Sequence, residues 1–484
     1  MFNVLLIDRS NPASYELAVH LAENIKNHDV HILFLSDKEA SCRKGNFEVV
    51  NISDIPQSKS LRELQAQYDF SLHKTLVTER AFFDYSSFRK TQRYSDLTLD
   101  EVYRVVTPYI NALDYLVRER VDLVIEGLAD NFMTSVAGKI ANHYHKKFVM
   151  AYMYYWWGNG LLMVDRTDQT SSIVDKEYQY YLERQEQLDR AMLDSFYGRQ
   201  VLQPFFPNNY TLRSRIAQLF NRYHSYEPLS FRNWILRRLA WMLSKLRIKL
   251  FIPFERKLKP EPFILFPLHV TPEATLLGGA PELADQFSLI KNLSMNLPAG
   301  VFLYVKEHPY QQMGLGLDYS FYKRLQSLPN VRLYSASVSA ESMYCNSNCL
   351  AVTVITGTVG LEAAIKKKPV FIFGRPIYHA AECFVKPKDW DEFFLIIKTI
   401  MNKEYSFNEA ALYAMLQALK ESTIQGEIDF TKARSWFELN SLGNANTIKF
   451  INQQYHEWKS SHSTPYMPRR SNHANIDSIY RLKY

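Results

Sequence analysis

The stretch from Val301 to Gly374 decides the fold of this 484-residue chain. Its short apolar runs each end in polar residues or glycine, and they read VFLYVKEHP from residue 301, LPNVRLY from residue 328, LAVTVITGTVGLEAA from residue 350 and PVFIFG from residue 369. Apolar runs of this length, separated by helix-length segments, predict a parallel sheet with crossover helices. Open α/β sheets bind ligands beyond the carboxyl ends of their strands, so the polar residues after these runs mark the expected active site.

The N-terminal half repeats the pattern. We expect strands at residues 4–7, 30–35, 47–52, 121–125 and 148–152, and helices at 15–26, 97–118 and 134–145. The chain therefore reads as an α/β protein with two such domains, which agrees with its length. The expected parts are an N-terminal domain at 1–165, a helical basic insertion at 166–259, a second α/β domain at 260–406, C-terminal helices at 407–459, and a flexible tail at 460–484. The C-terminal helices are placed to close the second domain, and they could also cross back onto the first.

The composition is that of a globular protein, with 47% hydrophobic and 22% charged residues. The four cysteines have neither the density nor the spacing of a disulfide or zinc framework, which indicates reduced thiols. The first residues, Met1–Asp8, have no basic region or cleavage site and read as a strand. No apolar window is long enough for a transmembrane helix. We expect a cytoplasmic protein.

Positive charge is concentrated in one segment. The net charge is +7, and residues 213–259 hold twelve Lys or Arg and only two acids, Glu227 and Glu255. Within that segment, residues 231–250 form a basic amphipathic pattern with Trp234 and Trp241. Such a helix can lie on an anionic membrane surface, here the inner membrane, or it can pack its apolar face on the protein while its cations stay solvated. We do not expect nucleic acid as a partner, because no recognised binding motif accompanies the charge.

Two motifs in the second half have the residue types of an anion or sugar site. Lys306, Glu307, His308 and Pro309 directly follow a strand, and the proline holds the strand exit extended so that His308 can donate to a phosphate or sugar oxygen. A structural histidine at a turn is the alternative for this dipeptide.

The second motif, TGTVG from residue 356, lies between a strand and a helix. Its small residues let backbone N–H groups approach an anion at a helix N-terminus. Glu362 follows in the first turns, where it can cap the helix or hold a sugar hydroxyl. The spacing fits neither a Walker A motif nor the dinucleotide fingerprint.

Two carboxylates complete the set of candidates. Glu273 lies in a polar loop that starts near His269 and ends in two glycines, and it could act as a base, a nucleophile or a charge stabiliser. Glu126 ends a strand of the first half and would face the same cleft if the two halves pack as expected. Each carboxylate alone is also consistent with a solvated loop residue.

Taken in order, these motifs resemble the bacterial capsule polysaccharide biosynthesis family, which includes the Kdo transferases of capsule assembly. The resemblance spans residues 263–378 most clearly. It implies the GT-B arrangement, in which two Rossmann-like domains face each other across a cleft and the donor nucleotide sits on the C-terminal half. By resemblance, His308 and Pro309, with Lys306 before them, hold the donor phosphate, and Thr356, Gly357, Thr358 and Glu362 form the loop and helix beside it.

The family also implies a chemistry. Glu273 falls near where the Kdo transferases carry an essential Asp. If the reaction is a retaining double displacement, Glu273 is the nucleophile and Glu126 the acid/base; if it is inverting, one carboxylate deprotonates the acceptor. The donor expected by resemblance is CMP-Kdo or another CMP-sugar, and the acceptor is a surface polysaccharide or glycolipid of capsule or lipopolysaccharide.

Other functions stay open on the sequence. The same fold could serve a non-catalytic scaffold that binds a glycan or nucleotide-sugar, or another nucleotide-sugar enzyme such as an epimerase. We expect no cofactor and no metal. The one Asp-x-Asp motif, which begins at Asp389, opens a predicted helix that runs from there to Ile400, so we interpret it as an N-terminal cap.

Overall fold

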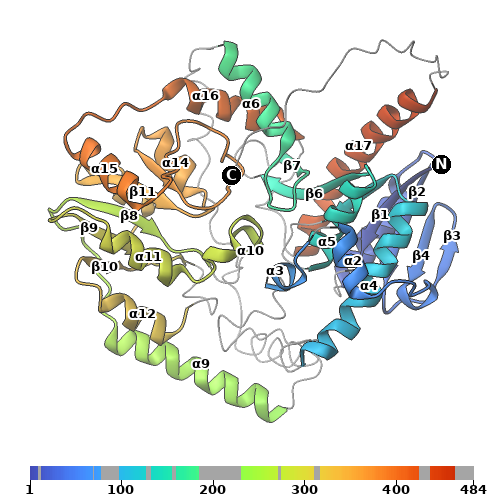
Figure 1. The fold of residues 1–484 in the computed structure, drawn as a ribbon, viewed down its shortest axis with the longest axis horizontal. Helices are drawn as coiled ribbons and strands as arrows, with labels where there is room; N and C mark the ends of the chain where they lie inside the picture. The colour runs from blue at the N-terminus through green and yellow to red at the C-terminus, as the bar shows by residue number, and fades with distance from the viewer. Residues whose placement is uncertain are drawn as a thin grey trace.

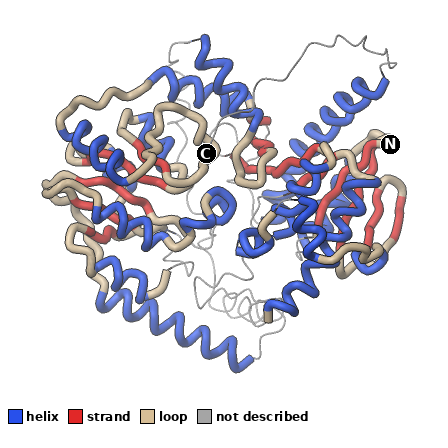
Figure 2. The backbone as a smooth tube through the Cα atoms, in the orientation of Figure 1, coloured by secondary structure: helices blue, strands red, loops and turns tan. Residues whose placement is uncertain are grey.

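The structure is a computed structural model, and it describes residues 1–8, 12–68, 70–77, 98–126, 132–154, 160–184, 231–270, 274–309, 317–424 and 436–463. These residues form two α/β units, each built around its own sheet (Figure 1). In both units helices lie against the sheet, as the tube in Figure 2 shows. The fold class expected from the sequence is therefore confirmed.

The N-terminal sheet has eight strands in the order β13-β7-β6-β5-β1-β2-β4-β3. They are β1 (Phe2–Ile7), β2 (Val30–Ser36), β3 (Cys42–Lys44), β4 (Phe47–Asn51), β5 (Leu123–Glu126), β6 (Lys147–Tyr154), β7 (Gly160–Val164) and β13 (Thr423–Ile424). The five strands from β6 to β4 in that order all pair in parallel. Numbered along the chain, these five stand in the order 3-2-1-4-5 of a Rossmann sheet.

The helices of this unit follow its strands along the chain. They are α1 (Pro12–Asn24), α2 (Leu61–Tyr68), α3 (Leu72–Val77), α4 (Leu99–Glu119) and α5 (Phe132–His143), with a 3-10 turn at Ile52–Asp54. The longest of them, α4, opens with a capping box in which Thr98 and Glu101 each bond the other's backbone N–H. Glu101, in the acidic first turn of α4, thus supplies one half of the cap.

The C-terminal sheet has five strands, all parallel, in the order β10-β9-β8-β11-β12. They are β8 (Phe263–Pro267), β9 (Phe302–Lys306), β10 (Val331–Tyr334), β11 (Cys349–Val354) and β12 (Val370–Ile372). This is again the 3-2-1-4-5 order, so β8 and β11 flank the point where the strand order reverses. The connecting helices are α10 (Ala274–Gly279), α11 (Gln286–Met295), α12 (Tyr319–Gln326), α13 (Ala340–Tyr344), α14 (Val359–Ile365) and α15 (Trp390–Met401), with a 3-10 turn at Pro281–Leu283.

Four further elements lie in the segments expected as the insertion, the C-terminal helices and the start of the tail. They are α6 (Ser172–Arg184), α9 (Phe231–Phe251), α16 (Glu409–Glu421) and α17 (Trp436–Ser463). Helices α6 and α16 pack against each other, β13 joins the N-terminal sheet beside β7, and α17 packs on α1. The chain therefore crosses back onto the first domain, as expected. Residues 464–484, which are most of the expected tail, lie outside the described residues.

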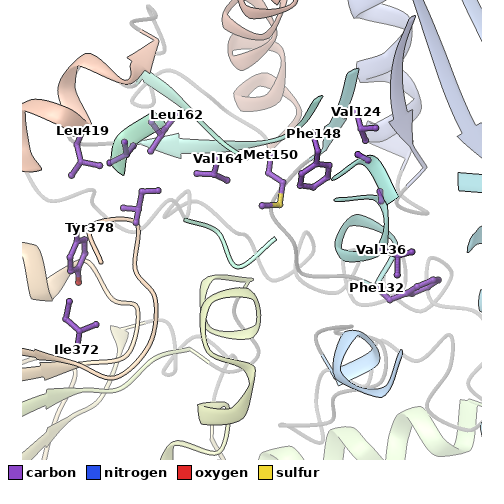
Figure 3. Packing of buried hydrophobic residues seen from close by; sticks show 14 of the residues in the cluster. Val124, Phe132, Val136, Phe148, Met150, Leu162, Val164, Ile372, Tyr378 and Leu419 are labelled. Carbon is purple, nitrogen blue, oxygen red and sulfur yellow. The ribbon is translucent and has the colours of Figure 1, made fainter. Parts of the chain in front are cut away.

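One hydrophobic core runs through both units. It joins the face of the N-terminal sheet that carries Met150 and Leu162 to α16, which contributes Leu419, and to Ile372 and Tyr378 of the C-terminal unit (Figure 3). Tyr178 of α6 belongs to this core and is fully buried, and its hydroxyl accepts a hydrogen bond of 3.0 Å from the backbone N–H of Glu382. Apolar packing and the partly buried Tyr178–Glu382 hydrogen bond thus help to tie the two units together.

We predict that Tyr178→Phe lowers the free energy of unfolding by about 1–3 kcal/mol, because the ring still fills its site while the Glu382 N–H loses its acceptor. Urea unfolding followed by circular dichroism measures this. The matched control is Tyr180→Phe on the same helix. The Tyr180 side chain is exposed, so removing its hydroxyl should change the free energy of unfolding by less than about 0.5 kcal/mol. Equal effects of the two substitutions would contradict the prediction.

Candidate functional site

A histidine and a threonine meet at the switch point of the C-terminal sheet. His269 follows β8 and Thr356 follows β11, and the backbone N–H of Thr356 donates to Nε2 of His269 over 3.3 Å. In this contact Nε2 of the ring is the acceptor. The backbone of His269 is itself held by Gln286, whose side-chain oxygen accepts from its N–H over 2.9 Å and whose amide donates to its C=O over 3.1 Å.

A tyrosine hydrogen-bonds the TGTVG loop that follows β11. The hydroxyl of Tyr378 donates to the backbone C=O of Gly357. A Cβ added at Gly360 would lie 2.4 Å from that hydroxyl, so only glycine leaves room for the tyrosine to reach the loop. The first residue of the motif, Thr356, is buried, and among the described residues nothing hydrogen-bonds its Oγ1. A buried hydroxyl of this kind calls for a partner, and here it belongs to the predicted ligand loop.

Thr358 and Glu362 form a pair beside this loop. Thr358 is exposed, and its hydroxyl donates to Oε1 of Glu362 over 3.2 Å instead of capping α14. Burial raises the pKa of the Glu362 carboxyl above its ordinary range, and the Thr358 hydrogen bond opposes that shift. The capping role considered for Glu362 is therefore not what the structure shows. Its carboxylate is held next to the loop, where a polar ligand group could replace the threonine as its partner.

The Lys306–Pro309 motif ends β9, the strand next to β8. Lys306 is buried, and its ammonium donates to the backbone C=O of Glu307 over 3.1 Å. Burial lowers the pKa of Lys306, and the charge of Glu307 opposes this. Glu307 is buried too and accepts a bond of 3.3 Å from the hydroxyl of Tyr322 on α12. His308 and Pro309 are the more accessible members of the motif, with His308 partly and Pro309 largely exposed.

The N-terminal sheet has its own switch point, between β1 and β5, and Glu126 lies there. It is 5% exposed, its Oε1 accepts a 2.7 Å hydrogen bond from the backbone N–H of Ile7, and its Oε2 accepts one of 3.4 Å from the hydroxyl of Thr134. The carboxylate thus ties the ends of two parallel strands to α5. Asp8, which follows β1, is held in turn by the hydroxyl of Ser36 over 2.8 Å.

The predicted residues therefore fall into three groups. The structure brings Thr356, Gly357, Thr358 and Glu362 together beside His269, and it places the Lys306–Pro309 motif one strand further along the same sheet edge. Glu126 belongs to the other sheet. Glu273 lies outside the described residues, between Val270 and the start of α10, so its role stays a prediction.

Contacts between the two units were missed by the sequence analysis. The guanidinium of Arg375, after β12, donates to Asp168 over 2.6 Å, and this ion pair together with bonds from Thr170 outweighs burial and lowers the pKa of Asp168. Nearby, the side chain of Gln169 packs so closely on Gly278 that a Cβ there would meet it at 1.9 Å. Nothing local in the sequence signals pairs this far apart along the chain. Tyr378 and Gln286 were missed for the same reason.

The Asp-x-Asp motif has the role that its position predicted. The carboxylate of Asp389 accepts a hydrogen bond of 2.8 Å from the backbone N–H of Glu392 and caps α15. Within the described part of the chain, no group of three or more His, Cys, Asp or Glu side chains is placed to hold a metal ion. The same residues include no helix that is both long and apolar enough to cross a bilayer.

The comparison with known families bears on this arrangement. Residues 176–382 match the model described as capsule polysaccharide biosynthesis protein, and they hold most of α6, all of α9 and the whole C-terminal sheet. This segment, which is less than half of the chain, is similar to the capsule polysaccharide biosynthesis family. The resemblance that the ordered motifs indicated is thereby confirmed, and the match begins well before the first of those motifs. No protein of curated function matches the chain.

Several solved structures share the general arrangement at low similarity. A β-Kdo 2,7 transferase, KpsC of Thermosulfurimonas dismutans, is 12% identical, with a TM-score of 0.31 over 66% of this chain and 87% of that one. Anabaena Alr3699/HepE, solved in complex with UDP, is 13% identical, with a TM-score of 0.31 over 95% and 100% of the two chains. UDP-GlcNAc 2-epimerase from Neisseria meningitidis is 11% identical, with a TM-score of 0.28 over 94% and 100%. At such scores the likenesses assign no activity to this chain.

We predict that Glu362→Gln stabilises the protein at neutral pH, because the burial that raises the carboxyl pKa makes its ionised form costly. For a carboxyl with a raised folded pKa, stability is fully present below its ordinary pKa of 4.5 and is lost as pH rises through the folded value. Melting temperatures of the two proteins should therefore converge near pH 4 and separate as pH rises. The control is Glu282→Gln, an exposed carboxylate, which should show no such separation. A difference that stays constant with pH would contradict this account.

Proposed function

We propose that this protein is a glycosyltransferase that moves a sugar from a nucleotide-activated donor onto a polysaccharide or glycolipid acceptor in capsule or lipopolysaccharide biosynthesis. The observation that carries the proposal is the site at the C-terminal switch point. There a buried Thr356 hydroxyl without a partner among the described residues lies in a small-residue loop beside His269. Ligands of doubly wound sheets bind at this place, and the family match covers the whole of this sheet.

The donor proposed is CMP-Kdo or another CMP-sugar. In this assignment His308 and Pro309 contact the donor phosphate, while Thr356, Gly357 and Thr358 line the loop beside it. What supports these roles is position, because all of them follow the carboxyl ends of β9 and β11. Lys306 would act at a distance through its charge, since its ammonium is bonded to the main chain.

In the transfer the bond between the sugar and the donor phosphate breaks, the nucleotide leaves with that electron pair, and an acceptor hydroxyl becomes bonded to the sugar as it loses its proton. A retaining enzyme would use Glu273 as the nucleophile and Glu126 as the acid/base, whereas an inverting enzyme needs only one carboxylate to take the acceptor proton. The position of Glu126 at the N-terminal switch point supports an acceptor-side role. We propose no metal for either route.

The proposed setting is the cytoplasm, with peripheral attachment to the inner membrane through residues 213–259. The charge of that segment supports attachment, because it contains twelve Lys or Arg residues and only two acidic residues. No nucleic acid is proposed as a partner.

The donor is tested by nucleotide binding. We predict that CMP raises the melting temperature of the purified protein and that UDP, GDP and dTDP do not, because a ligand that binds only the folded state stabilises it by about 2.7 kcal/mol at a hundredfold excess over Kd. His308→Ala should remove the shift, and His28→Ala, an exposed histidine of the first domain, should keep it. A shift with UDP or GDP instead would overturn the CMP-sugar donor. No shift with any nucleotide would count against the transferase.

A non-catalytic scaffold is the second candidate, and one observation favours it: the Glu126 carboxylate is engaged by a backbone N–H and a hydroxyl of its own domain. Turnover separates the two functions. For a transferase, we predict that Glu273→Gln and His308→Ala each lower the rate of sugar transfer by at least about a hundredfold, the scale expected for general acid–base groups. The rate is measured as release of the free nucleotide. A scaffold would release no nucleotide, whether unaltered or substituted, and the two variants would bind its glycan equally well.

A further inference from the structure

In the part of helix α9 whose side chains the structure describes, apolar side chains lie on two opposite faces, and those of the inner face are buried. On that side Ile248 and Ile252 are 7% and 5% exposed and pack into the core of the C-terminal unit against α12. The hydroxyl of Ser244 accepts a hydrogen bond of 3.0 Å from the backbone N–H of Tyr319 at the start of α12. Figure 1 shows α9 along the outer edge of this unit, with α12 between it and the sheet. These contacts account fully for the docking of the helix on the protein.

The outer face is apolar as well, and it is exposed. Five side chains, at 50–64% exposure, lie at the i, i+3, i+4, i+7 and i+11 spacing of a single helical stripe, namely Leu239, Met242, Leu243, Leu246 and Leu250. With Phe251, α9 supplies six of the fourteen large apolar side chains that are exposed among the described residues. Packing against the protein therefore explains one apolar face of α9 and leaves the other without a function.

The charges on α9 are all positive. Residues 231–251 contain six Lys or Arg and no Asp or Glu. At 100° per residue, Arg247 and Lys249 fall on opposite borders of the outer stripe, and both are exposed. Trp234 and Trp241 lie on the same helix, but their side chains are outside the described part. An apolar stripe bordered by cations on both sides complements a surface that is apolar inside and negatively charged at its rim.

We propose that the outer face of α9 docks on an anionic lipid bilayer, with the helix lying flat and its leucines inserted below the headgroups. A helix of 21 residues is about 31 Å long, so it can place the whole stripe at one depth. Leucines inserted next to cations combine apolar burial with attraction to acidic lipids. A protein surface of mixed charge would complement a helix without acidic residues less well than an anionic bilayer does. Binding to a protein instead is one of the outcomes of the test below.

The inner side of the same helix carries a lysine whose charge interacts with the candidate donor motif. Lys245 of α9 is partly buried; burial lowers its pKa, and the charge of Glu307 acts in the opposite direction. Glu307 directly precedes His308. A membrane bound to the outer face would thus hold the structural unit that carries the donor site, and it would keep a lipid-linked acceptor within reach of it. The docking names the face that would make the membrane attachment proposed above and rests on that proposed function, whereas the vesicle assay tests it independently of the donor site.

The test is co-sedimentation of the full-length protein with vesicles at low salt. We expect binding to vesicles of phosphatidylglycerol mixed with phosphatidylcholine and much weaker binding to phosphatidylcholine alone. The double variant Leu243→Gln/Leu246→Gln should lower the partition coefficient by on the order of tenfold or more, because two inserted leucines are lost. Arg247→Gln/Lys249→Gln should bind less and lose most of the dependence on salt.

The matched control is Met295→Gln/Leu395→Gln, which alters two equally exposed apolar side chains on α11 and α15. It should bind vesicles as the unaltered protein does. Equal loss in both double variants, no preference for anionic lipid, or no vesicle binding at all would overturn the proposal. A dimer that forms without lipid and is lost only in Leu243→Gln/Leu246→Gln would also overturn the proposal, because this face would then bind a second copy of the chain. The nucleotide-dependent melting shift of each variant reports separately on the donor site and should be unchanged.

Discussion

The parallel pairing of β8 with β11 is the contact on which the candidate site depends. The two strands are separated by about eighty residues of chain, and their pairing brings the loops after them to one edge of the sheet. Only there can the Thr356 N–H reach the ring of His269. Parallel strands need long crossovers, so the helices between them are a consequence of the same constraint. The site is therefore a product of strand order more than of any single motif.

What could be predicted from the sequence follows from this. Each apolar run has a local signature, and the polar residue that ends it is visible in the sequence, so the parallel strands and the residues at their ends were found, whereas the antiparallel strands β3 and β7 were not. The 3-2-1-4-5 order then fixes which ends meet. By contrast, the two-residue strand β13 has no periodicity to detect, and the Asp168–Arg375 pair joins loops of different units. The exposure of the second apolar face of α9 could not be predicted for another reason. The residue types of a helix face do not show whether the folded protein covers that face.

The two domains are joined by more than a linker. Helix α6 leaves the first domain and buries Tyr178 against the second, α16 returns along it, and the chain then re-enters the first sheet. A continuous apolar core along this route resists large rotations of one domain on the other, since interiors are densely packed. The ion pair of Arg375 with Asp168 is different, because both partners are polar and the arginine is largely exposed. Small rearrangements between the units would be accommodated there first.

The return of the chain has a consequence for synthesis. Strand β13 and the packing of α17, through Ile451 and Tyr455, onto Phe2 and its neighbours come from the last part of the chain. At about 5–20 residues per second, the ribosome needs on the order of tens of seconds to deliver these residues after the first strands have emerged. During that time the part of β1 and α1 that α17 covers in the finished protein stays exposed. The nascent first domain is thus a natural client for chaperones that bind exposed apolar segments, and truncation near residue 420 would leave it in that state.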